Sequence, residues 1–359
     1  MYEWNFPETN LPWLKARTVF LTVYGSHAYG TNRAGSDLDV RGVCMPPSKY
    51  YHGYLERFEQ AEFKGVQDAV IYEIRKFFKL AADCNPNALE ILFTDPRHHI
   101  QSTLIGDKLL ANRDRFLSRK AKHTFSGYAI SQLKRISLHR RWLLDPPKEA
   151  PTRAAFNLPE RTVIPADQLA VVWAGVRAKL EEWDPDLGDL DEAGRIAIKE
   201  RYATAIAEQR ITVDNQWMAA ARTMGVNENF ILLMDCEKRF NAAQTEWAQY
   251  QNWKKQRNPA RAELEAKYGY DTKHGMHLVR LLRMGREVLD GKGLVVFRPD
   301  REELGSIRDG AWDYDRLMAW ALDADKAMTE AVKTSPLPWG PDHKELDKLC
   351  QELVELSLS

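Results

Sequence analysis

Two aspartates that flank a single leucine are the first residues in this sequence whose types and spacing suggest chemistry. Asp37 and Asp39 lie in the stretch YGSHAYGTNRAGSDLDVRGV, residues 24–43. In an extended strand, residues two positions apart project on the same face, so both carboxylates are expected to point the same way. Two like charges side by side repel each other unless a cation or a shared proton lies between them. The spacing therefore predicts a metal site.

Gly25 and Ser26 precede this pair and end the apolar run RTVFLTVY, which is typical of a strand that leads into a turn. A glycine allows the backbone to approach a triphosphate closely, and the serine hydroxyl and exposed amides can donate hydrogen bonds to its oxygens. The aspartate pair would bind one or two Mg²⁺ ions that bridge the phosphates. A polar hairpin with solvated aspartates would explain the same residues without function.

A third carboxylate is needed to complete such a metal site, and two residues compete for the place. Asp68 lies in QDAVIY, the expected second strand of a hairpin that turns near Lys64 and Gly65, and Glu73 lies at the junction between that strand and the next helix. Asp68 is favoured because a carboxylate in the middle of a strand is costly unless it is used. Glu73, in contrast, suits the first turn of a helix.

The arrangement of Gly-Ser followed by Asp-x-Asp is found in the nucleotidyltransferase superfamily that includes DNA polymerase β. Four blocks of the chain, spread from about residue 20 to 310, together resemble the RlaP-like nucleotidyltransferases, a branch associated with RNA repair. These blocks are GSHAYGTNRAGSDLDVRGV, NPNALEILF, FLSRKAKHTFSGYAISQLKRI and GYDTKHGMHLVRLLRMGREVL. The resemblance implies a metal-dependent nucleotidyltransferase with an acceptor of RNA type.

The elements that must position these residues change in character along the chain. Short strands and helices alternate up to about residue 110, and long helical patterns follow. The expected fold class is therefore α+β, with a small mixed sheet and flanking helices over 1–110, and the resemblance implies that these residues form a polymerase-β-type nucleotidyltransferase domain. A mostly helical domain that binds nucleotide and acceptor is expected over 111–359, and its proline-containing stretch 146–165 is expected to be a loop or linker.

Several polar residues outside the aspartate pair are candidates for nucleotide binding. Arg41 lies two residues after Asp39 and would neutralise phosphate charge or orient Asp39, although a surface ion pair explains it equally well. In the expected helix around residue 130, Tyr128, Gln132, Arg135 and His139 share one polar face. Stacking on a base, reading its edge and binding phosphate would suit the first three, whereas a solvated helix face would show the same spacing.

A second polar helix face occurs in DTKHGMHLVRLLRMGREVL, residues 271–289. Lys273, His277 and Arg280 share a face, and a group of donors without an acid favours an anionic ligand such as phosphate. His274 and His277 have a spacing that suits zinc, but the sequence shows no third nitrogen or sulfur ligand close by.

Composition and charge limit the functional classes. The chain has 359 residues and a net charge of zero, so a global electrostatic attraction to nucleic acid is absent. Between Arg113 and Arg141, however, nine lysines and arginines face one acid, Asp114. The four cysteines are far apart and predict buried thiols in a reducing compartment. The N-terminus lacks the apolar core of a signal peptide, and no apolar run is long enough to span a membrane, so a cytoplasmic location without membrane contact is expected.

These observations converge on one expected activity and leave two alternatives. The expected protein transfers a nucleoside monophosphate from a nucleoside triphosphate, such as ATP, to an acceptor hydroxyl, with an RNA 3′ end, for instance that of a tRNA, as the expected acceptor. Its cofactor would be Mg²⁺, as two ions, with Mn²⁺ as a substitute. The alternatives are nucleotidylation of a protein or small molecule, and a non-catalytic module that binds nucleotide or RNA. The candidate catalytic and metal residues are Asp37, Asp39 and Asp68, and the candidate nucleotide-binding residues are Gly25, Ser26, Arg41, Tyr128, Gln132, Arg135, Lys273, His277 and Arg280.

Overall fold

A computed structural model describes residues 4–63, 68–183, 216–257 and 259–359 of the chain. The backbone forms two compact units, one made of residues 1–144 together with 259–359 and the other of residues 145–258. The expected boundary at residue 110 lies within the first unit, and the expected linker 146–165 lies within the second. The assignment of separate functions to residues 1–110 and 111–359 stays a prediction.

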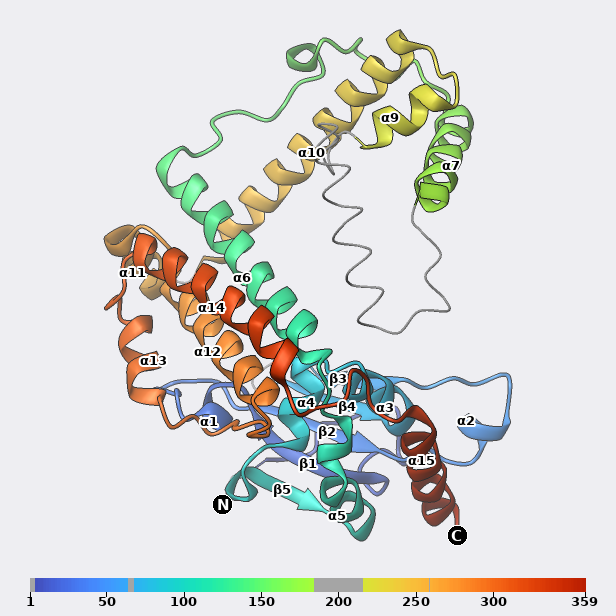
Figure 1. Cartoon of the computed structure of the whole chain (residues 1–359), viewed down its shortest axis with the longest axis vertical. Helices are drawn as coiled ribbons and strands as arrows, with labels where there is room; N and C mark the ends of the chain where they lie inside the picture. The colour runs from blue at the N-terminus through green and yellow to red at the C-terminus, as the bar shows by residue number, and fades with distance from the viewer. Residues whose placement is uncertain (1–3, 64–67, 184–215, 258) are drawn as a thin grey trace. The chain divides into compact units, whose positions relative to one another are not determined.

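The first unit contains a mixed five-stranded sheet near the N-terminus (Figure 1). The strands lie in the order β3-β4-β2-β1-β5; β2 and β4 are parallel, and the other neighbours are antiparallel. Their bounds are Thr18–Tyr24 for β1, Asp39–Cys44 for β2, Gln60–Phe63 for β3, Ala69–Glu73 for β4 and His99–Ser102 for β5. A mixed sheet with helices, followed by a mostly helical part, confirms the expected α+β class.

Both faces of the sheet are covered, which explains why the apolar strand β1 is buried along its whole length. On one face, Leu21 packs in a small core with Leu14 and Ile71. On the other, Phe20 belongs to a larger core that includes Phe77 and many residues of the helices that follow. A strand without a wet face reads as a continuous apolar run, as the sequence predicts here.

Short helices connect and flank the strands, and long helices follow. The helices of the first unit are α1 Gly25–Tyr29, α2 Lys49–His52, α3 Ile74–Ala82, α4 Pro86–Leu92, α5 Leu104–Ala111, α6 Ala121–Leu144, α11 Pro259–Tyr268, α12 Thr272–Leu289, α13 Arg301–Arg308, α14 Tyr314–Thr334 and α15 His343–Leu358. Helix α12 packs against α6, α13 and α14, and α15 packs against α3 and α5 (Figure 1). Most residues of α12 are buried, which makes it the central helix of this group.

The second unit contains α7 Ala166–Trp183, α9 Gln216–Thr223 and α10 Glu228–Gln256. It has a core of its own, in which Val176, Trp217 and Ile231 pack together. Among the described residues of the whole chain, no helix is both long enough and apolar enough to cross a membrane.

Candidate active site

The candidate metal residues lie at one edge of the sheet, where β1 ends and β2 and β4 begin. Asp39 is the first residue of β2 and pairs with Tyr24, the last residue of β1. The carbonyl oxygen of Asp68 accepts a hydrogen bond of 2.9 Å from the backbone N–H of Val40, so Asp68 lies directly before β4 and beside the start of β2. The expectation that Asp68 is in the middle of a strand is therefore wrong, and the expected turn at residues 64 and 65 is outside the described residues.

The pKa of Asp39 is shifted by its surroundings. Burial raises the pKa of Asp39, and the neighbouring carboxylates of Asp68 and Asp37 raise it further, whereas the cations of Arg41 and Lys273 lower it. Asp39 is half-buried and Asp37 is exposed. Ionised carboxylates in such proximity repel each other, and a cation between them would remove that cost.

The three carboxylates are not drawn together to ligand spacing in this structure. Among the described residues, the group of ligand atoms that lie within 4.8 Å of one another is elsewhere and does not include Asp37, Asp39 or Asp68. Because Asp37 is exposed in the loop before β2, its side chain has room to turn towards Asp39. Oxygen donors of this kind suit Mg²⁺ or Mn²⁺, and a bound cation would supply the attraction that the repelling carboxylates lack.

Gly25 lies directly against the Asp39 carboxylate. Its φ is +66°, and a Cβ at this position would lie 2.4 Å from Oδ2 of Asp39. Both the left-handed backbone conformation and the missing space therefore require glycine here. Ser26 follows in the first turn of α1, as the sequence predicts for the turn after β1.

Arg41 supports the backbone beside the aspartates. Its Nη1 donates hydrogen bonds to the carbonyl oxygens of Val40, at 2.8 Å, and Asp68, at 3.2 Å. Its guanidinium also lies over the ring of Tyr24, 5.1 Å from the centroid. These contacts join the ends of β1 and β2 to the residue before β4, and the charge of Arg41 stabilises the ionised form of Asp39.

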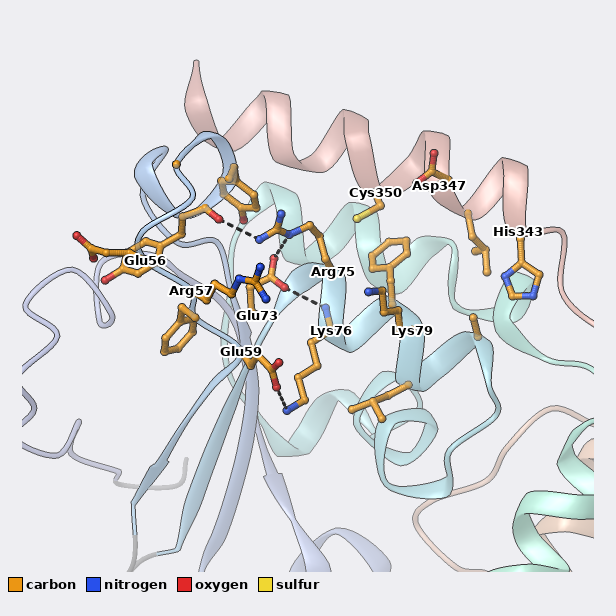
Figure 2. A pocket seen from close by; sticks show the side chains of 18 residues that line it. Glu56, Arg57, Glu59, Glu73, Arg75, Lys76, Lys79, His343, Asp347 and Cys350 are labelled. Atoms are coloured by element: carbon orange, nitrogen blue, oxygen red, sulfur yellow. Dashed lines mark hydrogen bonds and ion pairs between the residues drawn. The ribbon is translucent and has the colours of Figure 1, made fainter. Parts of the chain in front are cut away.

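Glu73, the competing candidate, lies at the opposite end of β4. Its side chain caps α3 by accepting a hydrogen bond of 3.0 Å from the backbone N–H of Lys76, and it forms an ion pair with Arg75 at 2.8 Å. Figure 2 shows Glu73 beside these two residues in a cavity of about 810 Å³ that lies between α3 and α15. Because β2 and β4 are parallel, this end of β4 is remote from Asp39, and the geometry favours Asp68.

The candidates on α6 and α12 differ in their surroundings. Tyr128 accepts a hydrogen bond of 3.0 Å at its hydroxyl from Asn85 Nδ2. Within the part of the chain that the structure describes, the buried Oε1 of Gln132 receives no hydrogen bond, as expected of an amide that awaits a ligand. Lys273 is close enough to Asp39 to lower its pKa. This brings the start of α12 to the aspartates.

Arg135 and His277 are the two remaining candidates on α6 and α12. Arg135 is exposed on α6, with its Nη1 3.4 Å from Nε2 of His274, and His277 is half-buried on α12. The roles of Arg135 and His277 in nucleotide binding stay predictions.

Arg280, which the sequence predicts to bind phosphate, makes a different set of contacts in the structure. Its side chain is 6% exposed and forms an ion pair with Glu90 of α4. Its guanidinium carbon lies over the ring of Tyr29, 3.7 Å from the ring centroid. The hydroxyls of Tyr24 and Tyr29 each donate a hydrogen bond of 2.6 Å to the other carboxylate oxygen of Glu90. Burial and then the charge of Glu90 raise the pKa of Tyr24 well above its usual value, so this hydroxyl stays a donor.

Glu90 and Tyr24 are residues that the sequence analysis missed. They fix the end of β1, directly before Gly25, to α4 and α12. The signal available in the sequence is weak: a glutamate within the apolar helix PNALEIL, which is buried on α4.

Most of the basic block between Arg113 and Arg141 makes contacts within the first unit. Arg119 donates to the carbonyl oxygens of Ser335 and Leu337, and Lys122 forms an ion pair with Asp325. Lys120 pairs with Asp83, and Arg140 donates to the carbonyl oxygen of Gly269. The block therefore stabilises the fold to a large extent, and the number of its charges alone is weak support for nucleic-acid binding.

Comparison with known proteins places the candidate site in a recognised region. Residues 9–143 match the model of RlaP, described as the RNA repair pathway DNA polymerase beta family. The uncharacterized 38.9 kDa protein in the nrdC-mobD intergenic region of Enterobacteria phage T4 is 31% identical over 127 residues. This similarity covers 32% of the present chain and 38% of the phage protein. The family match includes all three candidate aspartates, whereas Lys273 and the rest of α12 lie outside it.

Proposed function

We propose that this protein is a metal-dependent nucleotidyltransferase that acts on RNA, a proposal supported by the match of residues 9–143 to RlaP, the RNA repair pathway DNA polymerase beta family. The observation that carries the proposal is that Asp37, Asp39 and Asp68 lie around the starts of β2 and β4, with Gly25 against the Asp39 carboxylate. Carboxylate oxygens thus lie beside a backbone position that has no room for a side chain. The metal ions of a bound triphosphate would need the carboxylates, and its phosphates would need the close approach to the backbone.

The three aspartates are assigned to the binding of Mg²⁺, with Mn²⁺ as a substitute. Divalent ions bound there would neutralise phosphate charge and lower the pKa of the attacking hydroxyl. Asp37 and Asp39 would serve the triphosphate, and Asp68 would lie at the acceptor hydroxyl. Lys273 adds a cation near Asp39, where the negative charge of the phosphates would be greatest.

The reaction is an in-line displacement at the α-phosphate of a nucleoside triphosphate. The acceptor hydroxyl forms the new ester bond, the bond to the β-phosphate oxygen breaks, and pyrophosphate leaves. Gly25 and Ser26 would bind the triphosphate, and Gln132, with its buried oxygen, is suited to accept a hydrogen bond from a base. Tyr128 would stack on that base.

An RNA end is the acceptor that we propose. The description of the family as part of an RNA repair pathway supports this choice. Lys134 and Arg135 are exposed on α6 and offer positive charge to a phosphate backbone.

The function is tested by incubating the full chain and Mg²⁺ with each α-labelled nucleoside triphosphate and separate pools of RNA, protein and small molecules. We expect label to enter RNA and pyrophosphate to be released. The variant Asp37→Asn with Asp39→Asn should lose this activity by a factor on the order of 100 or more, because the loss of metal-binding charge costs several kcal/mol in the transition state.

A matched control and three contrary outcomes make the test decisive. Asp323→Asn, which alters an exposed aspartate on α14, should keep the wild-type rate. Incorporation by the double variant at the wild-type rate would refute the assignment of the site. Label in protein or small molecules instead of RNA would replace the acceptor, and nucleotide binding without pyrophosphate release from any pool would replace the enzyme with a binding module.

A further inference from the structure

A second group of potential metal ligands, which includes none of the three aspartates, lies between α6 and the start of α12. His139 of α6, with Asp271 and His274 at the start of α12, places one ligand atom each within 4.8 Å of the others. Asp271 is 2% exposed, and the side chain of His274 is 13% exposed. A carboxylate buried this deeply is costly unless a cation or strong hydrogen bonds compensate for its lost hydration.

The fold orients each member of this group. Asp271 is the N-cap of α12, and its Oδ1 accepts a hydrogen bond of 3.1 Å from the backbone N–H of His274. Its other oxygen, Oδ2, therefore faces Nδ1 of His274 at 2.6 Å. The ring of His139 stacks on Trp142 and meets the ring of His274 edge to face, with centroids 6.0 Å apart. Capping and stacking restrict the side chains, as supporting contacts do at metal sites.

We infer that His139, Asp271 and His274 bind one divalent transition-metal ion of the zinc type, which ties α6 to α12. Two imidazole nitrogens and one carboxylate form a donor set that zinc accepts, with a fourth position left for water or substrate. Mg²⁺ prefers oxygen ligands, so this site differs chemically from the aspartates at the sheet edge. In the sequence, the spacing of His274 and His277 suits a metal ion, but in the fold the potential ligands near His274 are His139 and Asp271.

Metal binding would also change the position of Arg135. The ion would replace the proton between His274 Nδ1 and Asp271 Oδ2, and the remaining proton of His274 would lie on Nε2. That nitrogen is 3.4 Å from Nη1 of Arg135, so two donors would then face each other. Because Arg135 is exposed, its side chain can turn away into solvent, where it would be available to a phosphate.

The site is tested by titrating the metal-stripped full chain with Co²⁺, without nucleotide, and recording the visible absorption of nitrogen-ligated Co²⁺. We expect one equivalent to give this band and Zn²⁺ to displace it. Loss of a second-sphere partner costs metal sites about 10–100-fold in affinity, so loss of the ligand in His139→Gln should weaken Co²⁺ binding at least as much. The same variant should lose the rise in melting temperature that Zn²⁺ gives the wild type.

Two controls separate this site from the rest of the chain. His123→Gln changes an exposed histidine on the same helix and should keep the band. The variant Asp37→Asn with Asp39→Asn should also keep it, so failure of the proposed transferase would not affect the result. Absence of the band from the wild type would overturn the inference. An unchanged affinity in both His139→Gln and His274→Gln, with folding verified by circular dichroism, would overturn it too.

Discussion

At the scale of single residues, Gly25 joins a backbone requirement to a chemical one. Its left-handed φ of +66° favours glycine, and the space that a Cβ would need is filled by Oδ2 of Asp39. A side chain at this position would therefore displace the Asp39 carboxylate. Strain and displacement of Asp39 are separable, because the chain contains another glycine with a similar φ.

Gly25→Ala is expected to remove nucleotidyltransferase activity with only a modest loss of stability. The left-handed conformation costs a residue with a Cβ about 1–2 kcal/mol, and the clash at 2.4 Å forces Asp39 away from the metal position. Label incorporation and the melting temperature should be measured together.

Gly35→Ala is the matched control for this prediction. Gly35 has a φ of +78°, and a Cβ added there meets no atom within 4 Å. It should show a similar loss of stability while the activity persists. Equal activity in the two variants would contradict the role given to Gly25.

At the scale of secondary-structure elements, a buried ion pair connects α4 to α12. Arg280 and Glu90 are almost fully buried, and the hydroxyls of Tyr24 and Tyr29 complete the hydrogen bonds of the carboxylate. This network fixes the end of β1, where the candidate site begins, to two helices from distant parts of the chain. Removal of one charge would leave the other buried without an opposite charge.

Arg280→Met is expected to destabilise the protein by about 3–5 kcal/mol, because the Glu90 carboxylate would then be buried without a cation, with only the hydroxyls of Tyr24 and Tyr29 as donors. The double variant Arg280→Met with Glu90→Gln should recover a large part of this loss, since neither charge remains. The free energy of unfolding in urea measures both effects.

Arg286→Met on the same helix is the control. Arg286 is exposed and pairs with Asp290 one turn later, so its loss should change stability by at most about 1 kcal/mol. If Arg280→Met were as stable as the wild type but bound nucleotide weakly, the original assignment of Arg280 to phosphate would be restored.

The same elements show what local sequence patterns can predict. The apolar run of β1 and the long helix α6 follow from periodicity, which acts over a few positions. The ion pair of Arg280 joins residues separated by 190 positions, and no local pattern contains that information. The same holds for His139, which reaches Asp271 and His274 only after α6 and α12 pack together.

The candidate site shows the same division. Gly25 and Asp39 lie at the end of β1 and the start of β2, where the apolar run and the turn after it place them. Asp37, in contrast, lies in the loop before β2, so the expectation that one strand carries both aspartates is wrong. Asp68 was a choice between two carboxylates at opposite ends of β4, and only strand pairing favours one end. The basic block was misleading, because a count of charges cannot tell a solvated lysine from one that pairs with Asp325.

At the scale of the whole molecule, the hydrophobic cores follow the division into two units. The two cores that cover the sheet contain only residues from 1–144 and 259–359. The third core contains only residues between Ile164 and Met234. A unit with its own core can fold by itself, and the first unit is interrupted in sequence by the second.

We therefore expect a chain in which residues 145–258 are replaced by a flexible Gly-Ser linker to fold cooperatively and to retain the sheet and the helices around α12. The cost of closing a flexible loop rises only slowly with its length, so a generous linker removes the need to match its span to the ends of α6 and α11. Urea unfolding followed by circular dichroism should show one transition.

As a control, the same linker inserted between Leu144 and Asp145 without deletion should leave stability almost unchanged, which separates the effect of the linker from that of the missing unit. If the shortened chain showed no cooperative transition while the insertion control stayed stable, the first unit would depend on residues 145–258 for its stability. Its two hydrophobic cores contain none of these residues.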